Sequence, residues 1–128
     1  MREILFRGKQ TDTGEWVEGS YLKMDECAYI MPPVKYTGIT IVEMFVRVNP
    51  ETVGQYTGIN THKNVNIFEG DMLRFESFRT CKKTGYVLYD TSEYVIQTEL
   101  GKYNAFREYE IEVIGNIHDN PNLIAEGE

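Results

Sequence analysis

The sequence predicts an all-β protein built from short strands that glycine-containing turns separate. Nine tyrosines, six phenylalanines and one tryptophan stand among many β-branched residues, and both classes favour the pleated surface of a sheet. Glycines in turn-like contexts recur at short intervals, at Gly14, Gly38, Gly58, Gly70, Gly85 and Gly101. Many short strands punctuated in this way are typical of a β-sandwich or a small barrel.

The first part of the chain predicts four strands. They are expected at residues 4–7, 16–22, 28–31 and 40–48. Pro32 and Pro33 end the third strand, because proline cannot donate a hydrogen bond to a ladder. The fourth has the clearest alternation in the chain, with Val46 and Val48 on one face and Arg47 on the other.

One turn of helix is expected directly after the fourth strand. Asn49 stands at the position of a helix cap and Pro50 at the first helical position, which is a favourable start. Gly54 follows closely and limits the helix to a single turn. We therefore divide the chain into an N-terminal β-rich segment, residues 1–47, and a C-terminal domain, residues 48–128.

The second part predicts four more strands and a short tail. The strands are expected at residues 71–78, 85–89, 94–98 and 109–117, and residues 118–128 form the tail. A small barrel fills its interior with one face of each strand. The core residues expected from this alternation are Leu73, Phe75, Val87, Tyr89, Val95 and Val113.

The charge of −7 is unevenly distributed. Six acids and no Lys or Arg follow residue 107, so residues 1–107 carry fourteen acids against thirteen basic residues. This near-neutral body lacks the basic footprint of a dedicated nucleic-acid-binding protein. No apolar run approaches the ~20 residues that span a bilayer, and the start of the chain is not a secretory signal. We expect a cytoplasmic protein that makes no contact with membranes.

Five segments resemble the YopX-like family of phage and prophage proteins. They are REILFRGK at 2–9, GEWVEG at 14–19, VNPETVGQYTG at 48–58, IFEGD at 67–71 and VIGNIHDNP at 113–121. Residues 60–66 depart from the family pattern, since they lack the expected Asp and Gly. The resemblance implies an SH3-type barrel in the C-terminal half, an additional β-rich N-terminal part and an oligomer encoded by phages. It brings no catalytic residue.

The sequence indicates no enzyme, cofactor or metal. The three serines stand in no nucleophile elbow, and the run Lys82 to Gly85 lacks the upstream glycine of a phosphate loop. Cys27 and Cys81 are expected to be reduced thiols, with a disulfide between them as the alternative.

Two further pairings of polar side chains are weighed and set aside. A pairing of Cys81 with His118 would be coincidental, and His62 lacks zinc-site spacing. Glu69 and Asp71 could pair as acids or bind a cation, although turn capping is enough to explain Asp71.

The aromatic residues predict an interaction surface. Nine tyrosines exceed what a small core can absorb with every hydroxyl satisfied, and Tyr and Trp are enriched at protein interfaces; the alternative is that they decorate solvent-facing strand positions. The surface is expected to include Trp16, Tyr21, Tyr56, Arg74, Phe78 and Arg79.

Three functions follow from these observations. The leading one is a non-enzymatic phage accessory protein that associates with itself and with a host or phage protein. The second is a nucleic-acid-binding barrel, with a contact strip formed by Arg74, Phe75, Phe78, Arg79, Lys82 and Lys83. The third is an acidic decoy that uses residues 108–128, although six acids are sparse beside one phosphate charge per ~1.7 Å of duplex.

Overall fold

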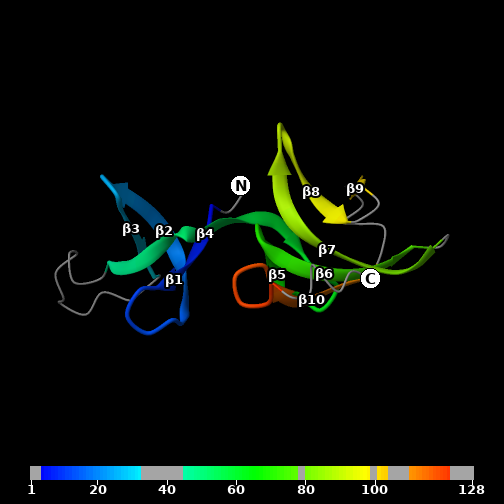
Figure 1. Cartoon of the computed structure of the whole chain (residues 1–128), viewed down its shortest axis with the longest axis horizontal. Coiled ribbons are helices and arrows are strands. Elements are labelled where there is room, and N and C mark those ends of the chain that lie inside the picture. The colour runs from blue at the N-terminus through cyan, green and yellow to red at the C-terminus, as the bar shows by residue number, and fades with distance from the viewer. Residues whose placement is uncertain (1–3, 33–44, 78–79, 99–100, 104–109, 122–128) are drawn as a thin grey trace. The chain divides into compact units, whose positions relative to one another are not determined.

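The computed structural model of the chain is all-β, as the sequence predicts (Figure 1). It describes residues 4–32, 45–77, 80–98, 101–103 and 110–121, with side chains at all of these except 76, 77 and 80–83. These residues form ten strands and no helix. The strands are β1 (Phe6–Gln10), β2 (Trp16–Met24), β3 (Cys27–Met31), β4 (Val46–Asn60), β5 (Asn66–Phe68), β6 (Asp71–Ser77), β7 (Thr80–Asp90), β8 (Glu93–Thr98), β9 (Gly101–Tyr103) and β10 (Ile111–Asn116).

The strands fall into two compact units, Met1–Tyr56 and Thr57–Glu128, which we call the N-terminal and C-terminal units. In the N-terminal unit β1 pairs with β2, β2 with β3, β3 with β4, and β4 again with β1, all antiparallel. These pairings close a ring of four strands. β4 continues into the C-terminal unit and is the neighbour of β5 in the sheet.

The predicted turn of helix after the fourth strand is wrong, because residues 49–53 lie inside β4. The pairing of β4 with β1 changes register between Arg7 and Lys9, and residues 50–53 of β4 bulge out there. Asn49 Oδ1 accepts the amide of Glu51 at 3.2 Å, which is a local cap that serves a bulge as well as a helix start.

Thr52 fixes the other side of this bulge. Its hydroxyl donates to the carbonyl of Asn49 at 2.6 Å and accepts the amide of Lys9 on β1 at 2.9 Å. A side-chain oxygen therefore replaces the backbone acceptor that the bulge removes from the ladder. The ring stays bonded although its register is broken.

The core of the N-terminal unit lies on one face of its strands. Ala28, Ile30 and Val48 are fully buried there. Four partly buried side chains pack against them, namely Phe6, Val17, Tyr21 and Val53. Val48 lies on the buried face, as its alternation predicts; residues 40–44 of that predicted strand, and Gly38, lie outside the described residues.

The C-terminal unit is built on a five-stranded sheet in the order β10-β6-β7-β8-β9, and each of these pairings is antiparallel. Leu73, Phe75 and Val87 are buried in its core, as predicted. The sequence interpretation missed three core residues, Ile67, Ile96 and Ile111, which complete the same cluster. The SH3-type barrel that the resemblance implies for this half stays a prediction.

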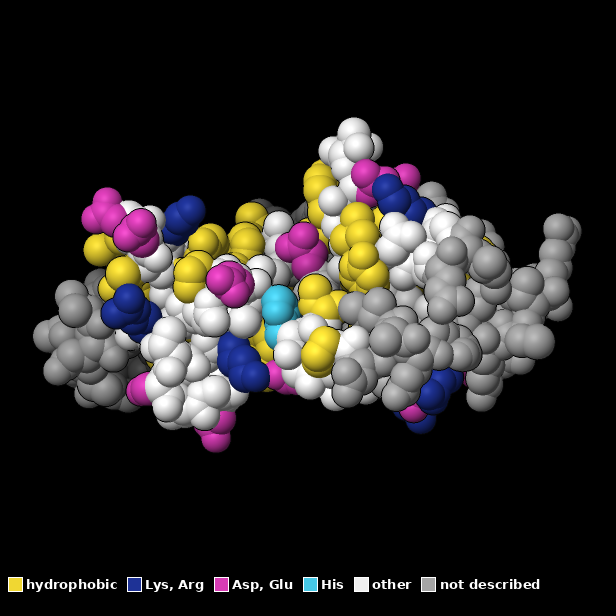
Figure 2. Space-filling view, viewed as in Figure 1, with side chains coloured by type: hydrophobic (Ala, Val, Ile, Leu, Met, Phe, Trp, Pro, Cys, Tyr) yellow, Lys and Arg dark blue, Asp and Glu magenta, His cyan; other side chains and the backbone are white. Residues whose placement is uncertain are grey.

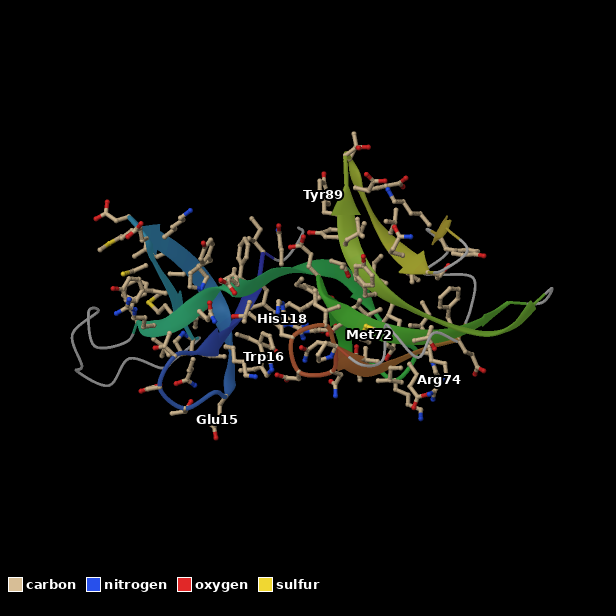
Figure 3. All side chains as sticks on the ribbon, in the orientation of Figure 1. Glu15, Trp16, Met72, Arg74, Tyr89 and His118 are labelled. Carbon is tan, nitrogen blue, oxygen red and sulfur yellow. The ribbon has the colours of Figure 1, made fainter. Side chains whose placement is uncertain are left out.

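The predicted core position of Tyr89 is wrong, since this side chain is 52% exposed. Tyr89 lies near the far end of β7, beside the turn to β8 (Figure 3). It shares the inward face of Val87, but the hairpin extends beyond the core at this position. The ring instead packs edge-on against Tyr94 of β8, with centroids 5.0 Å apart.

Val95 and Val113 are placed less simply. Val95 is buried, but it pairs with Leu88, so it lies on the opposite face of the sheet from Val87, which pairs with Ile96. Val113 is half-buried and packs against the cluster. Met72, which alternation places with Arg74 on the outward face, is also buried. Both faces of the sheet therefore bury apolar side chains near the start of β6.

Gly85, predicted as a turn, lies inside β7 instead. A β-carbon at this position would stand 2.6 Å from the carbonyl oxygen of Gln97 and 2.8 Å from a methyl of Ile96, both on the neighbouring β8. Close approach of two strands, rather than a reversal of the chain, explains this glycine.

Two turns that carry the family resemblance bind each other in the C-terminal unit. Gly70 adopts a φ of 89° and accepts the amide of Ile117 at 2.8 Å. Next to it, the buried Asp71 accepts the amide of Phe68 at 2.8 Å, which confirms the capping role expected from the sequence. The residues of segments 67–71 and 113–121 that carry the resemblance therefore have a structural role in holding these two turns together.

Candidate interaction surfaces

Trp16, the first residue predicted for an interaction surface, lies half-buried at the start of β2. The guanidinium carbon of Arg7, on the adjacent strand β1, stands 4.8 Å from the centre of its ring. A cation over an aromatic face is a stabilising contact within the sheet. Trp16 is thus engaged within its own unit.

The two tyrosines predicted for the surface turn inward. Tyr21 packs against the N-terminal core, and its ring centroid lies 5.2 Å from that of Phe6. Tyr56 is buried at 8% exposure. The Tyr21 ring therefore contributes to the interior of the N-terminal unit, and the Tyr56 ring is not exposed for an interaction surface.

Arg74 is the one described basic residue of the predicted surface, and it is exposed on β6 of the C-terminal unit. Its Nη1 lies 3.7 Å from Glu112 Oε1 on the adjacent strand β10 (Figure 3 labels Arg74). Phe78 and Arg79 lie outside the described residues, as do the side chains of Lys82 and Lys83. Phe75 of the predicted nucleic-acid strip is 1% exposed, so its ring is not available for stacking on a base.

A different surface emerges on the N-terminal unit. The register of β2 with β3 places Leu22 opposite Tyr29 and Met24 opposite Cys27, on the side of these strands that faces away from the core. Most of the side chains on this side are apolar, although Ser20 lies opposite Met31 and Arg47 opposite Tyr29. We call them the outer face: Leu22, Met24, Cys27, Tyr29, Met31 and Phe45.

The outer face is partly open to solvent. Met24 is 54% and Leu22 37% exposed, and the other four side chains are half-buried. Tyr29 and Phe45 meet edge-to-face with centroids 6.4 Å apart. Figure 2 shows hydrophobic side chains beside the acidic residues at the tip of the β2–β3 hairpin. These strands therefore present apolar side chains on both faces.

The signal for the outer face was present in the sequence. An ordinary half-buried hairpin alternates apolar with polar positions, whereas residues 27–31 of β3 are apolar at every position. The sequence interpretation looked for aromatic and basic residues, so it selected Trp16 and Tyr56 and did not consider Leu22 and Met24.

The C-terminal unit carries an open cavity of about 460 Å³. The β4–β5 turn, β6 and β10 form its walls, and Arg74 is among its lining residues. Its apolar lining comes from Val65, Phe75, Ile111 and Val113. His62, Lys63, Glu110 and Glu112 complete the charged or titratable groups around it.

The candidate catalytic and metal-binding residues are dispersed. Cys27 is a free thiol on the outer face, and the side chain of Cys81 lies outside the described set. His62 is exposed in the β4–β5 turn, while His118 is half-buried beside Gly70 (Figure 3). Among the described side chains, no group of three or more His, Cys, Asp or Glu is arranged to hold a metal ion. The described part of the chain also has no helix with the length and hydrophobicity needed to cross a bilayer.

Comparisons with known proteins place the chain in a family. The fold is similar to the crystal structure of protein EF1440 from Enterococcus faecalis, with a TM-score of 0.63. The two chains are 20% identical, and the likeness covers 97% of this chain and 99% of that one. No curated protein matches the sequence. A model of the family described as YopX protein matches residues 5–125, which is nearly the whole chain, and this chain therefore belongs to the YopX family.

Proposed function

We propose that this protein is a non-enzymatic interaction module that associates with copies of itself through the outer face of its N-terminal unit. The observation that carries the proposal is the pair of exposed apolar side chains, Leu22 and Met24, on a sheet face with four more apolar neighbours. Apolar side chains gathered on one face gain free energy when a second surface removes them from water.

A second copy suits this face because the face carries little charge. The chain has a net charge of −7, so two copies repel each other over most approaches. Within the outer face the charged side chain is Arg47, which pairs in register with Tyr29. Asp25 and Glu26 lie at the margin of the face, in the turn at the hairpin tip. A two-fold contact uses the same patch on both copies, and an apolar, nearly uncharged patch can meet itself without like-charge repulsion.

The wider role belongs to the same proposal. Membership of the YopX family supports a phage-encoded accessory protein that acts in the cytoplasm of a host bacterium, where a host or phage protein is a further partner. The non-enzymatic part is supported by the sequence, in which no nucleophile elbow or phosphate loop is found.

Nucleic acid is the weaker candidate partner. The predicted contact strip needs exposed aromatic rings beside free cations. In the structure Phe75 is part of the core, and Arg74 lies within ion-pair distance of Glu112. The described portion of the strip therefore lends no support to base stacking.

Multi-angle light scattering across a concentration series tests self-association. The wild-type chain is expected to exceed the monomer mass at micromolar concentrations, and the variant Leu22→Gln/Met24→Gln to shift toward the monomer. Lys23→Gln is the matched control, since Lys23 is exposed on the same strand but points to its opposite side. It should leave the mass unchanged.

Two results would overturn this proposal. One is a wild-type chain that stays monomeric across the whole series. The other is a double variant that is folded, as judged by its circular dichroism, and assembles as the wild type does. The second result would place the contact elsewhere on the molecule.

A further inference from the structure

The cavity of the C-terminal unit lies beside the edge of a sheet. Ile111 and Val113 of β10 contribute to its lining, and so does Glu112 between them. Successive residues of a strand point to opposite faces, so a cavity lined by all three runs along the strand rather than over one face. β10 is the end strand of the order β10-β6-β7-β8-β9 among the described strands.

A strand at the end of a sheet directs alternate N–H and C=O groups away from its single neighbour. In β10 these groups point away from β6, and residues 110–113, in and just before this strand, line the cavity. The site therefore offers two things together: a backbone edge that can accept another strand, and an apolar cavity of about 460 Å³ for that strand's side chains.

The wall opposite β10 is held in place by its own hydrogen bonds. Thr61 is buried, and its Oγ1 accepts the amides of Lys63 and Val65 at 3.3 and 3.2 Å. The Asn60 amide also donates to Asn64 Oδ1 at 2.9 Å. A wall fixed before binding loses little freedom when a ligand arrives, which favours binding.

The charge at this edge selects the occupant. Glu110 and Glu112 are exposed on the β10 wall, and Glu112 keeps a side chain 67% exposed despite its 3.7 Å approach to Arg74. The basic side chains that line the cavity, Lys63 and Arg74, come from the β4–β5 turn and from β6, so on the β10 side the charged groups are both acidic. Opposite charges on adjacent strands are a favourable cross-strand pair.

We propose that this cavity binds an extended segment of another protein in which basic residues alternate with apolar ones. The segment adds to the edge of β10, its apolar side chains enter the cavity beside Val65 and Ile111, and its basic side chains lie against Glu110 and Glu112. This site is distinct from the outer face, and the proposal stands whether or not the chain associates with itself.

Fluorescence anisotropy with the full chain and labelled synthetic peptides tests the proposal. The probe is a short peptide in which lysine alternates with valine. A matched peptide carries glutamate in place of lysine, and a third carries proline at its central valine, where proline removes a donor and breaks an added strand. We expect saturable binding of the lysine peptide that weakens with salt, and binding of the other two that is weaker by about tenfold or more.

Two variants locate the site. Glu110→Gln/Glu112→Gln is expected to weaken binding of the lysine peptide about tenfold, and Val65→Lys, at an exposed position of the opposite wall, to weaken it as well. The matched control is Asp12→Asn/Glu15→Gln, which removes the same charge from exposed positions of the N-terminal unit and should leave binding unchanged.

Each contrary result overturns the proposal. Equal binding of the proline peptide would show charge attraction without strand addition, and equal loss in the control variant would show a response to net charge alone. Displacement of the peptide by a single-stranded oligonucleotide would identify a nucleic acid as the occupant. The outcome does not depend on the light-scattering result, so the two proposals fail separately.

Discussion

Gly19 is the residue at which the fold leaves least room. A β-carbon there would collide with the carbonyl oxygen of Met31 and come within 2.9 Å of the α-carbon of Pro32. Both obstacles are backbone, so they cannot move aside as a side chain would. We expect Gly19→Ala to lower the free energy of unfolding by about 1–3 kcal/mol, as overpacking does.

Chemical denaturation monitored by tryptophan fluorescence measures this loss. Ser20→Ala is the control, because Ser20 is the exposed next residue of the same strand. A Gly19→Ala variant as stable as the control would contradict the close approach of β2 and the end of β3.

Asp71 is a residue whose role is structural despite its charge. It is 2% exposed, and its carboxylate accepts the amide of Phe68 at 2.8 Å within the turn that leads into β6. Asp71→Ala leaves a buried backbone donor without this acceptor, so we expect a loss of about 1–3 kcal/mol in unfolding free energy. Thermal unfolding measures it, and Asp12→Ala, at an exposed position, should unfold as the wild type does.

Asp90 gives a pH-dependent prediction. A hydrogen bond from Lys102 Nζ to its Oδ2 at 3.0 Å, together with the charge of Lys102, lowers the pKa of Asp90 below its ordinary value of 3.8. A lowered pKa in the folded state means that the pair stabilises the fold above pH 3.8 and that this contribution is lost as the pH falls through the lowered pKa.

Carboxyl titration by NMR checks this sign. Lys102→Gln is expected to return the pKa of Asp90 toward 3.8, and the small stability difference between variant and wild type should vanish in strong acid. An Asp90 pKa that is unchanged by the substitution would show that Lys102 does not set it.

At the scale of one element, β4 shows how far local sequence can mislead. Asn49 supplies a side chain that can cap a backbone amide, and Pro50 has a fixed φ. Both properties suit the start of a helix and a β-bulge equally. The choice is made by β1, whose Lys9 amide finds its acceptor in Thr52 Oγ1. No pattern within residues 49–54 reveals that partner, because it lies 43 residues away.

Thr52 is therefore the residue that holds the bulge to the ring. Thr52→Ala removes one acceptor and one donor and is expected to cost about 1–2 kcal/mol of unfolding free energy. Thr52→Ser keeps the hydroxyl and should recover most of that loss. Denaturant titration of both variants measures the difference, and equal losses would assign the effect to the methyl group instead of the hydrogen bonds.

The elements that the sequence predicts well are those whose two faces differ in polarity. β6 shows this over Leu73, Arg74 and Phe75, where buried and exposed positions alternate as predicted. The prediction of burial fails where both faces of the sheet are covered, as at Met72. It also fails where a strand extends beyond the core, as at Tyr89. Both failures have the same cause: local alternation says which side chains share a face, but only the assembled sheet says what covers each face.

The interaction surfaces follow the same logic at a larger scale. The outer face could be read in part from the uninterrupted apolar residues 27–31. The cavity at β10 could not, because its walls come from residues 61–65, 74–75 and 110–113, which only the tertiary fold brings together. Arg74 was predicted as a surface residue because of its charge. It lines the cavity because β6 lies beside β10 in the sheet, and this pairing cannot be seen in the local sequence.

For the molecule as a whole, the decisive feature is that each unit has a core of its own. Ala28, Ile30 and Val48 form one cluster, while Phe75 belongs to the other. Removing a large side chain from one cluster leaves a cavity only there, so Ile30→Ala and Phe75→Ala are expected to cost about 2–5 and 3–5 kcal/mol respectively. The two substitutions should also lower local stability in different units of the protein.

Hydrogen exchange measured by mass spectrometry resolves the two units. In Ile30→Ala, exchange should accelerate over β1, β2 and β3, and in Phe75→Ala over β6, β7 and β8, with each variant leaving the other group near its wild-type rates. The double variant should lose the sum of the two single losses, since the substituted side chains belong to separate clusters. β4 alone runs through both units, so its amides are expected to respond to either substitution. Acceleration of every strand by each single variant would instead mean that β4 couples the two cores into one cooperative fold.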